Sequence, residues 1–182
     1  MCSDSVKDYK LKNGKELHLH LKEGAIQHII NGCYSTKPIG DKKVVKVLTG
    51  GLHTIEGWMN FKSEYASVLE HLHFYNESDH KYWYYARELS NGVVTLRIPK
   101  ELFSGKAAKI TMYPDDYYKS GYLWKTLFPK GYDRSKITSA IGEVIENEDE
   151  SQKQKGQIIG YINNLDPNNK IKAVIQYRGK DI

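Results

Sequence analysis

Paired glycines followed at once by a histidine most constrain how this chain folds. The stretch Thr49-Gly50-Gly51-Leu52-His53 lies between a valine-rich run and an aromatic segment, and Gly57 follows shortly after it. Glycine adopts backbone angles closed to other residues and lets the main chain approach another group closely. The stretch therefore predicts a tight turn after a strand. It leaves His53 with two interpretations, an ordinary turn residue or a side chain presented to a substrate.

The size and composition of the chain favour a folded protein. Its 182 residues are enough for one compact domain or two small lobes. Hydrophobic residues make up 40% and charged residues 27%, a balance typical of globular chains and not of disordered ones. No apolar run is long enough to span a membrane, and residues 1–5 lack the basic and apolar parts of a secretory signal. We therefore expect no membrane segment in this chain.

The cysteines and histidines do not form a metal-binding pattern. The two cysteines, Cys2 and Cys33, are too few for a disulfide framework and lack the paired spacing of a zinc site. We expect Cys33 to be reduced and partly buried. His18 and His20 share one face of an expected strand without a third ligand, so exposed strand histidines are favoured over a metal pair. The sequence predicts no metal and no cofactor. Three further histidines are interpreted as surface residues: His71, His73 and His80.

The charge and the aromatic content point towards polyanions. The formal net charge is +5, and the chain has 14 tyrosines and 3 tryptophans. Basic proteins attract polyanions through counterion release, and aromatic faces beside lysines stack on unpaired bases. Residues 79–85 and 117–125 carry this pattern. Because tyrosine is also common in strands, each run is either an RNA-binding surface or ordinary sheet structure.

Hydrophobic periodicity predicts an α+β fold of antiparallel hairpins with a few helices. The clearest helix covers residues 133–145, where isoleucine and valine recur on one face and Asp133 is placed as the N-cap. One or two helical turns are expected at 64–72, and a loop at 34–43. A hairpin turn is predicted at Asn91-Gly92. Residues 16–21 are expected to form a strand or the start of a short helix, and strands are expected at residues 44–48, 83–89, 93–98, 107–113, 156–163 and 170–177.

Two histidines and a lysine are sufficient for metal-independent RNA cleavage. A base removes the ribose 2′-hydroxyl proton, an acid protonates the departing 5′-oxygen, and a cation stabilises the charged phosphorane. Imidazole serves as acid or base near neutrality because its ordinary pKa is about 6.5. Lysine is a compact charge suited to phosphate oxygens, and tyrosine stacks on a base or orients the ribose.

Four ordered segments resemble the motifs of the EndoU endoribonuclease family: residues 27–32, 49–57, 125–129 and 174–177. The Gly-Gly-Leu-His element is most similar to the coronavirus uridylate-specific branch. The Phe-Pro pair followed by an amphipathic helix resembles the bacterial toxin branch. The resemblance covers roughly residues 24–182. It implies an EndoU-like, RNase A-like arrangement of antiparallel sheets with two lobes around a catalytic cleft. The expected segments are 1–23, then lobes at about 24–110 and 111–182.

The resemblance also implies the catalytic residues. His28 matches the family's first histidine and His53 its second, and Lys125 matches the catalytic lysine. In this assignment His53 is the base towards the 2′-hydroxyl, His28 is the acid towards the 5′-oxygen, and Lys125 stabilises the phosphorane. Both spacings along the chain, from His28 to His53 and from His53 to Lys125, are longer than in the family, so an insertion is implied. Other lysines that remain open for this role are Lys100, Lys106, Lys119 and Lys130.

Three further residues are expected at the substrate. Tyr177 matches the family's terminal tyrosine, and Thr126 stands beside Lys125 where a serine-like group recognises the base. Gly51 is expected to let the main chain approach the substrate closely. Ile175 occupies the position of a family threonine two residues before the tyrosine, so the base preference stays open.

The function implied by the resemblance is that of a toxin. It is a metal-independent endoribonuclease that cleaves single-stranded RNA, tRNA in the bacterial branch, with a uridine bias, leaving 2′,3′-cyclic phosphate and 5′-hydroxyl ends. Such domains stand at the carboxyl ends of contact-dependent inhibition or polymorphic toxins, are secreted within a larger effector, and act in the target-cell cytoplasm. We expect a cognate immunity protein as partner, and a monomer without it. The alternatives are an RNA-binding module of the same fold without catalysis, and a structural domain.

Overall fold

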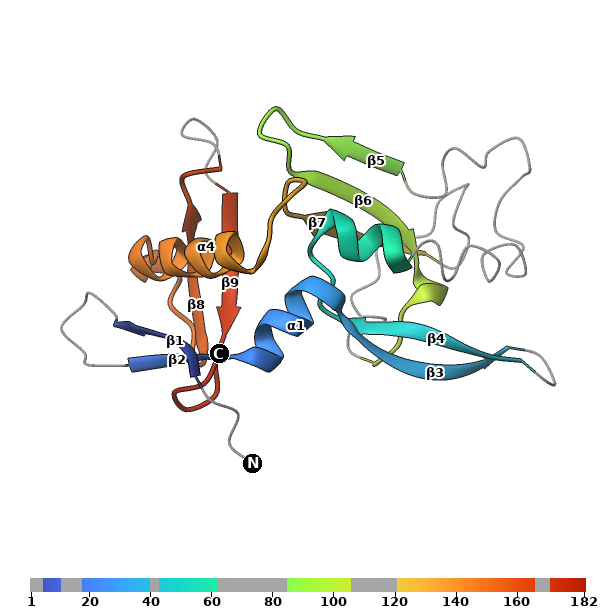
Figure 1. Ribbon diagram of the computed structural model, residues 1–182, viewed down its shortest axis with the longest axis horizontal. Coiled ribbons are helices and arrows are strands. Elements are labelled where there is room, and N and C mark those ends of the chain that lie inside the picture. The colour runs from blue at the N-terminus through green and yellow to red at the C-terminus, as the bar shows by residue number, and fades with distance from the viewer. Residues whose placement is uncertain (1–4, 11–17, 40–42, 62–84, 106–120, 166–170) are drawn as a thin grey trace. The chain divides into compact units, whose positions relative to one another are not determined.

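The structure, a computed structural model, describes residues 5–10, 18–39, 43–61, 85–105, 121–165 and 171–182. Within these ranges the chain is α+β, as the sequence predicts, with helices and small sheets of antiparallel strands (Figure 1). Two compact units divide it. Unit 1 comprises residues 1–27 and 132–182, and unit 2 comprises residues 28–131. The division falls within helix α1, Glu23–Asn31.

Unit 1 contains two antiparallel strand pairs and a helix. Its elements are β1 (Ser5–Lys10), β2 (His18–Lys22), α4 (Arg134–Glu146), η3 (Glu150–Gln152), β8 (Gln157–Ile162) and β9 (Ile171–Gln176). β1 pairs with β2, and β8 pairs with β9. The Tyr9 hydroxyl donates to the Thr138 carbonyl at 2.7 Å, which joins β1 to α4. The amino-terminal strands therefore pack with the carboxyl-terminal part of the chain.

Helix α4 confirms the predicted helix and its cap. The Asp133 side chain accepts a hydrogen bond from the Lys136 amide at 3.0 Å, which satisfies one of the donors left free at the start of a helix. The apolar face is buried, and it comprises Ile137, Ala140, Ile141, Val144 and Ile145. Strand β8 passes so close to this helix that a Cβ on Gly160 would lie 2.1 Å from the Val144 carbonyl oxygen.

Unit 2 contains a hairpin and a three-stranded sheet. The hairpin is β3 (Cys33–Ile39) with β4 (Lys43–Gly50), and the sheet is ordered β5 (Tyr85–Glu88), β6 (Val94–Pro99), β7 (Tyr122–Leu127). A short 3-10 helix, η2 (Lys100–Leu102), follows β6, and residues 55–61 are helical. One buried cluster joins β4, β6, η2, β7 and the helical segment, and its members are Val47, Leu48, Leu52, Trp58, Phe61, Leu96, Ile98, Leu102, Phe103, Leu123 and Leu127.

Several sequence predictions are confirmed, and two are wrong. Strands appear in the expected places at β2, β4, β5, β6, β8 and β9, and β5 and β6 are antiparallel neighbours as the Asn91-Gly92 turn predicts. The expected loop at 34–43 is wrong, because residues up to Ile39 form β3. The loop was predicted because proline is rare inside sheets. Both strands of a two-stranded sheet are edge strands, however, and proline is tolerated there. Cys33 is free but exposed, so its expected partial burial is also wrong.

Some expectations lie outside the described residues, namely the helical turns at 64–72, the strand at 107–113, and His71, His73 and His80. After α4 the chain forms η3, and Asp149 caps it by accepting a hydrogen bond from the Ser151 amide at 3.1 Å. Among the described residues, no helix has the length and apolar character that crossing a membrane requires.

Candidate active site

The loop after β4 is hydrogen-bonded to the end of helix α1. The amides of Leu52 and His53 donate to the carbonyls of His28 and Ile29, at 2.9 and 2.6 Å. The Thr54 hydroxyl donates to the next carbonyl along the helix at 3.0 Å. The last carbonyls of a helix have no partner within it, so this loop satisfies them. The same contacts bring His28 and His53, which are distant in sequence, into one neighbourhood of unit 2.

The paired glycines make this close approach possible, at the point where strand β4 ends. Gly51 has a φ of +70°, and a Cβ there would lie 1.9 Å from the His28 carbonyl oxygen. A Cβ on Gly50 would lie 3.0 Å from Cε1 of the His28 ring. Leu52 also has a positive φ, +64°, which is unusual for a branched side chain and is held by full burial. The close approach of Gly51 is to helix α1, and its approach to a substrate stays a prediction.

One ring nitrogen of His53 has a hydrogen-bond partner, and the other has none among the residues that the structure describes. Its Nδ1 lies 3.0 Å from the main-chain oxygen of Thr126 in β7. A carbonyl only accepts, so Nδ1 carries the proton and the neutral ring has its lone pair on Nε2. Burial, with a smaller contribution from the charge of Lys125, lowers the pKa of His53 to about 4, and the bond to Thr126 opposes the shift. At pH 7 His53 is therefore a neutral imidazole.

Lys125 lies on the buried face of β7. Leu123 and Leu127, two residues away on either side, are buried on that face, whereas Trp124 and Thr126 are exposed on the other. The Lys125 ammonium donates to the Gly51 carbonyl. Burial lowers its pKa to about 8, so it is still mostly charged at pH 7.

His28 completes the group. Burial lowers its pKa, and the charge of Lys125 adds to the effect. The charge of His28 in turn lowers the pKa of His53, so the three groups lie within electrostatic reach of one another. The Nδ1 atom of His28 lies 3.1 Å from the Cys33 sulfur. In the part of the chain that the structure describes, Nε2 of neither histidine has a hydrogen-bond partner. Both Nε2 atoms are therefore available to a ligand.

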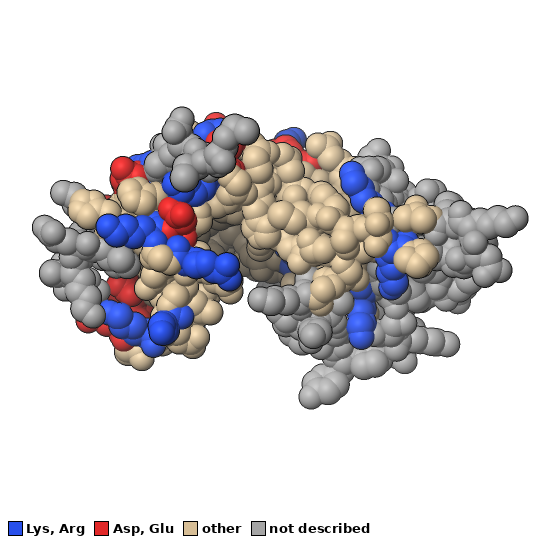
Figure 2. Space-filling model, turned by 90° about the horizontal axis from the view of Figure 1, so that it is seen from below, with Lys and Arg blue, Asp and Glu red and all other residues tan. Residues whose placement is uncertain are grey.

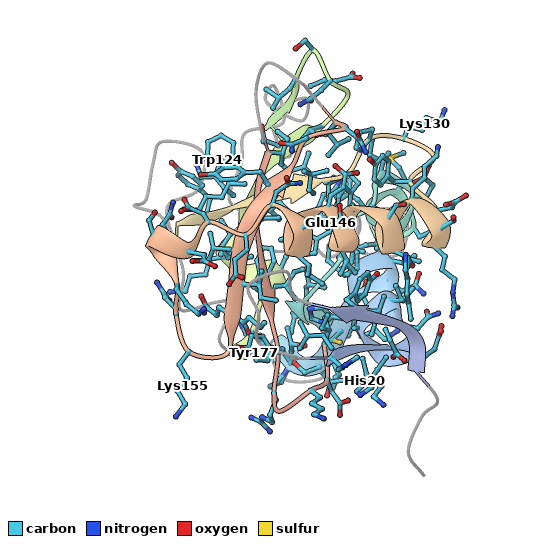
Figure 3. The ribbon with its side chains drawn as sticks, turned by 90° about the vertical axis from the view of Figure 1, so that its left-hand side faces the viewer. His20, Trp124, Lys130, Glu146, Lys155 and Tyr177 are labelled. Atoms are coloured by element: carbon cyan, nitrogen blue, oxygen red, sulfur yellow. The ribbon has the colours of Figure 1, made fainter. Side chains whose placement is uncertain are left out.

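The residues expected to contact the substrate lie in different units, with Thr126 in unit 2 and Tyr177 in unit 1. Thr126 contributes its carbonyl to His53, while its side chain projects from the face of β7 opposite to Lys125. Tyr177 belongs to unit 1 and follows β9 (Figure 3), and its amide donates to the Gly156 carbonyl at 2.9 Å. Ile175 is buried in the core of unit 1, with 8% of its surface exposed. An apolar core residue thus occupies the position of the family threonine.

Of the lysines considered for the catalytic role, Lys125 is the one that lies near the two histidines within the described residues. Lys100 and Lys130 are exposed, and Lys130 extends outward in Figure 3. Neither contributes to the pKa shift of His28 or His53. The remaining two, Lys106 and Lys119, lie outside the described residues.

The two histidines of strand β2 lie in unit 1, and His20 makes a local contact between β2 and β1. His18 and His20 are half-buried on one face of β2, on either side of buried Leu19. The His20 Nδ1 pairs with the Asp8 carboxylate at 2.7 Å. No group of three His, Cys, Asp or Glu side chains is placed to hold a metal among the described residues. That cleavage needs no metal or cofactor stays a prediction.

The sequence did not indicate the two groups that contact the Nδ1 atoms of the histidines, namely the Thr126 carbonyl and the Cys33 sulfur. A carbonyl carries no residue signature, and a single cysteine beside a histidine in space has none along the chain. Comparison of the chain with family models, curated proteins and solved structures gives no match. The geometry therefore carries the functional argument, and it offers a neutral imidazole, a second imidazole whose pKa is lowered less, and a charged lysine.

Proposed function

We propose that this chain is a metal-independent endoribonuclease whose catalytic residues are His28, His53 and Lys125. The observation that carries the proposal is the hydrogen bond from His53 Nδ1 to the Thr126 carbonyl, 3.0 Å long. It leaves an unprotonated Nε2, which has no partner in the described part of the chain, beside a second imidazole and a lysine ammonium. A general base needs that state, and the low pKa of His53 keeps it neutral at pH 7.

The cleavage step uses the three groups in turn. His53 Nε2 removes the proton of the ribose 2′-hydroxyl, and the 2′-oxygen attacks the adjacent phosphorus. The Lys125 ammonium stabilises the negative charge that develops on the non-bridging oxygens. His28, protonated on Nε2, gives that proton to the 5′-oxygen as its bond to phosphorus breaks. The products are a 2′,3′-cyclic phosphate and a 5′-hydroxyl. Anionic phosphate bound nearby raises the pKa of an imidazole, which favours the protonated His28 that this step requires.

The surface supports an RNA substrate. Lysine and arginine side chains spread over the described face seen in Figure 2, with acidic side chains among some of them, and the net charge is +5. Trp124 (Figure 3) is 44% exposed on the face of β7 opposite to Lys125. The Tyr122 ring meets it edge-on, with ring centroids 6.0 Å apart. An exposed indole stacks on unpaired bases. We therefore propose single-stranded RNA as substrate.

The finer parts of the proposal follow from the EndoU resemblance. They are a uridine bias with tRNA as target, substrate contacts by Tyr177, Thr126 and Gly51, and action as a toxin domain within a secreted effector in the target-cell cytoplasm. A cognate immunity protein belongs to the same proposal. It would cover the Nε2 atoms of the two histidines, so its addition should stop cleavage.

A second candidate is an RNA-binding module without catalysis. Exposed Trp124 and the basic side chains serve binding as well as cleavage, so they favour this candidate equally. The burial of Lys125 between Leu123 and Leu127 argues against it, because burying an ammonium group is costly and a binding surface needs only exposed cations.

Incubation of the purified protein with total RNA in the presence of a chelator tests the proposal. We expect discrete fragments with 2′,3′-cyclic phosphate ends, and no cleavage of a substrate whose cleaved position lacks the 2′-hydroxyl. His28→Ala and His53→Ala should each lose about 10²- to 10⁴-fold in rate while keeping the fold and RNA affinity. His20→Ala, a histidine variant of unit 1, serves as the control and should cleave normally. RNA bound but left intact by the wild type favours the binding module. Cleavage abolished by chelator and restored by manganese contradicts metal independence.

A further inference from the structure

Cys33 occupies a fixed position beside the ring of His28. It is the first residue of β3, and Gly32, which has a φ of +74°, precedes it. The Gly32 amide donates to the His28 carbonyl at 3.1 Å, so the chain turns directly from α1 into β3. Any side chain at Gly32 would meet Leu48 at 2.8 Å. The main chain that carries the thiol is therefore tightly constrained.

A β-bulge adds to this constraint. Cys33 pairs with Gly50, whereas the next residue, Tyr34, pairs with Leu48, so the register shifts between them. A bulge of this kind bends the strand and re-aims a side chain, and bulges are common beside active sites. The partner Gly50 has no side chain, and the His28 ring lies in the space that a Cβ would fill. The ring thus lies against Gly50 with its Nδ1 at the Cys33 sulfur, 3.1 Å away.

The orientation of the ring decides which of its nitrogens can react. With Nδ1 held by the sulfur, Nε2 remains without a partner among the described residues. In the protonated ring, Nδ1–H donates to the sulfur, so the proton on Nε2 is the one that can be given away. In the neutral ring, a thiol can also donate to a bare Nδ1, because sulfur is both a weak donor and a weak acceptor. A thiol can therefore remain the partner of Nδ1 in both charge states.

We infer that Cys33 is a positioning residue for His28, holding Nδ1 so that Nε2 faces the departing oxygen of the substrate. The inference rests on the proposed function, because it gives Cys33 its role through the proposed acid. It parallels the contact that orients His53, where the Thr126 carbonyl holds Nδ1. The two histidines thus have different partners, a carbonyl for the base and a thiol for the acid.

Two substitutions separate positioning from mere packing. Cys33→Ala removes the partner of Nδ1, and we expect about a tenfold loss in kcat on RNA with little change in KM, since one modest hydrogen bond is lost. Cys33→Ser keeps a group that both donates and accepts, and it should retain kcat within about twofold of the wild type. Ser35→Ala is the matched control on the same strand. It removes the contact of Ser35 with Ser104, 2.7 Å long, and should leave kcat unchanged.

The leaving group provides the readout that a structural role would not move. A uridine 3′-phosphodiester with a nitrophenol leaving group needs no proton from the acid, so Cys33→Ala should cleave it at the wild-type rate. An equal loss on this substrate and on RNA overturns the inference, as does a serine variant as slow as the alanine variant.

Nitrogen NMR of the histidine rings tests the contact without any cleavage. In Cys33→Ala the Nδ1 and Nε2 signals of His28 should shift, while those of His53 should not. If the wild-type protein cleaves no RNA, the proposed function fails, and this spectrum then decides the contact by itself. A His28 spectrum unchanged by Cys33→Ala overturns the inference, and a shift confined to His28 supports it.

Discussion

The amide of His53 donates a hydrogen bond of 2.6 Å to the carbonyl of Ile29, the residue directly after His28. A main-chain contact therefore fixes the separation of the two histidines, without any side chain taking part. Since the carbonyls at the end of α1 need partners, the contact satisfies the helix and builds the candidate site at once. Substitutions that push the loop away from the helix should affect stability and catalysis together.

Gly51→Ala should lower the free energy of unfolding more than Gly131→Ala does. Both glycines have a positive φ, +70° and +75°, so each substitution carries the strain of a left-handed backbone, about 1–2 kcal/mol. At Gly51 the new Cβ would also lie 1.9 Å from the His28 carbonyl oxygen, whereas at Gly131 nothing lies within 4 Å. Urea unfolding of the two variants measures the difference, and equal losses would show that the loop does not lie against α1.

The pH dependence of kcat/KM should be bell-shaped with an acidic optimum. This quantity reports the pKa values of the free enzyme. His53 must be neutral, so the rate rises as the pH passes about 4. His28 must be protonated, and its pKa is lowered from the ordinary value of about 6.5. The rate should therefore begin to fall with rising pH before pH 6.5 is reached. Lys125, with a pKa of about 8, adds a further loss at higher pH. An optimum above pH 7 would contradict these assignments.

A substrate with a good leaving group should distinguish the two histidines. Such a substrate needs no proton on the departing oxygen, so it should rescue His28→Ala almost fully. His53→Ala should stay slow, because the 2′-hydroxyl still has to lose its proton. Steady-state rates on RNA and on a nitrophenyl phosphodiester of uridine give the comparison. Rescue of His53→Ala alone would reverse the roles of acid and base, and equal rescue of both variants would overturn the assignment.

Lys125→Met should slow cleavage by about 10²- to 10³-fold, the range seen when one group that stabilises a developing negative charge is removed. It should also raise the pKa of both histidines, because the charge of Lys125 lowers each of them. The acid limb of kcat/KM should then move to higher pH. Lys130→Met makes the same charge change at an exposed lysine and is the control. Proton NMR titration of the imidazoles measures the shift, and an unchanged pKa for His53 would place Lys125 elsewhere.

The stability of the fold should fall between about pH 6.5 and pH 4 through His53. The pKa is about 4 in the folded protein and about 6.5 when unfolded, so the unfolded chain binds more protons over this range. The contribution of the neutral ring is fully present above pH 6.5 and is lost as the pH falls towards 4. The free energy of unfolding at pH 7 and pH 4.5 should therefore differ more for the wild type than for His53→Gln. The same difference in both proteins would contradict the burial of His53.

Local sequence signals determined much of the secondary structure. The periodic apolar face of α4 and its Asp133 cap, the Asn91-Gly92 hairpin, and the alternating strands β8 and β9 all follow from residues near one another in the chain. The Gly50-Gly51 pair indicated a place where the main chain can approach another group closely, and Gly51 has a positive φ that glycine takes without strain. His28, His53 and Lys125 were singled out by the resemblance of short motifs to the EndoU family, and their catalytic roles stay predictions.

Only the tertiary structure decided what those residues contact. The sequence placed a loop where β3 pairs with β4, because the partner strand and not local preference stabilises residues around Pro38. It also gave no sign that residues 1–27 group with 132–182. The tautomer of His53 depends on the Thr126 carbonyl, and Nδ1 of the His28 ring contacts the Cys33 sulfur. A main-chain carbonyl is the same in every residue, so such contacts appear only once the chain has folded.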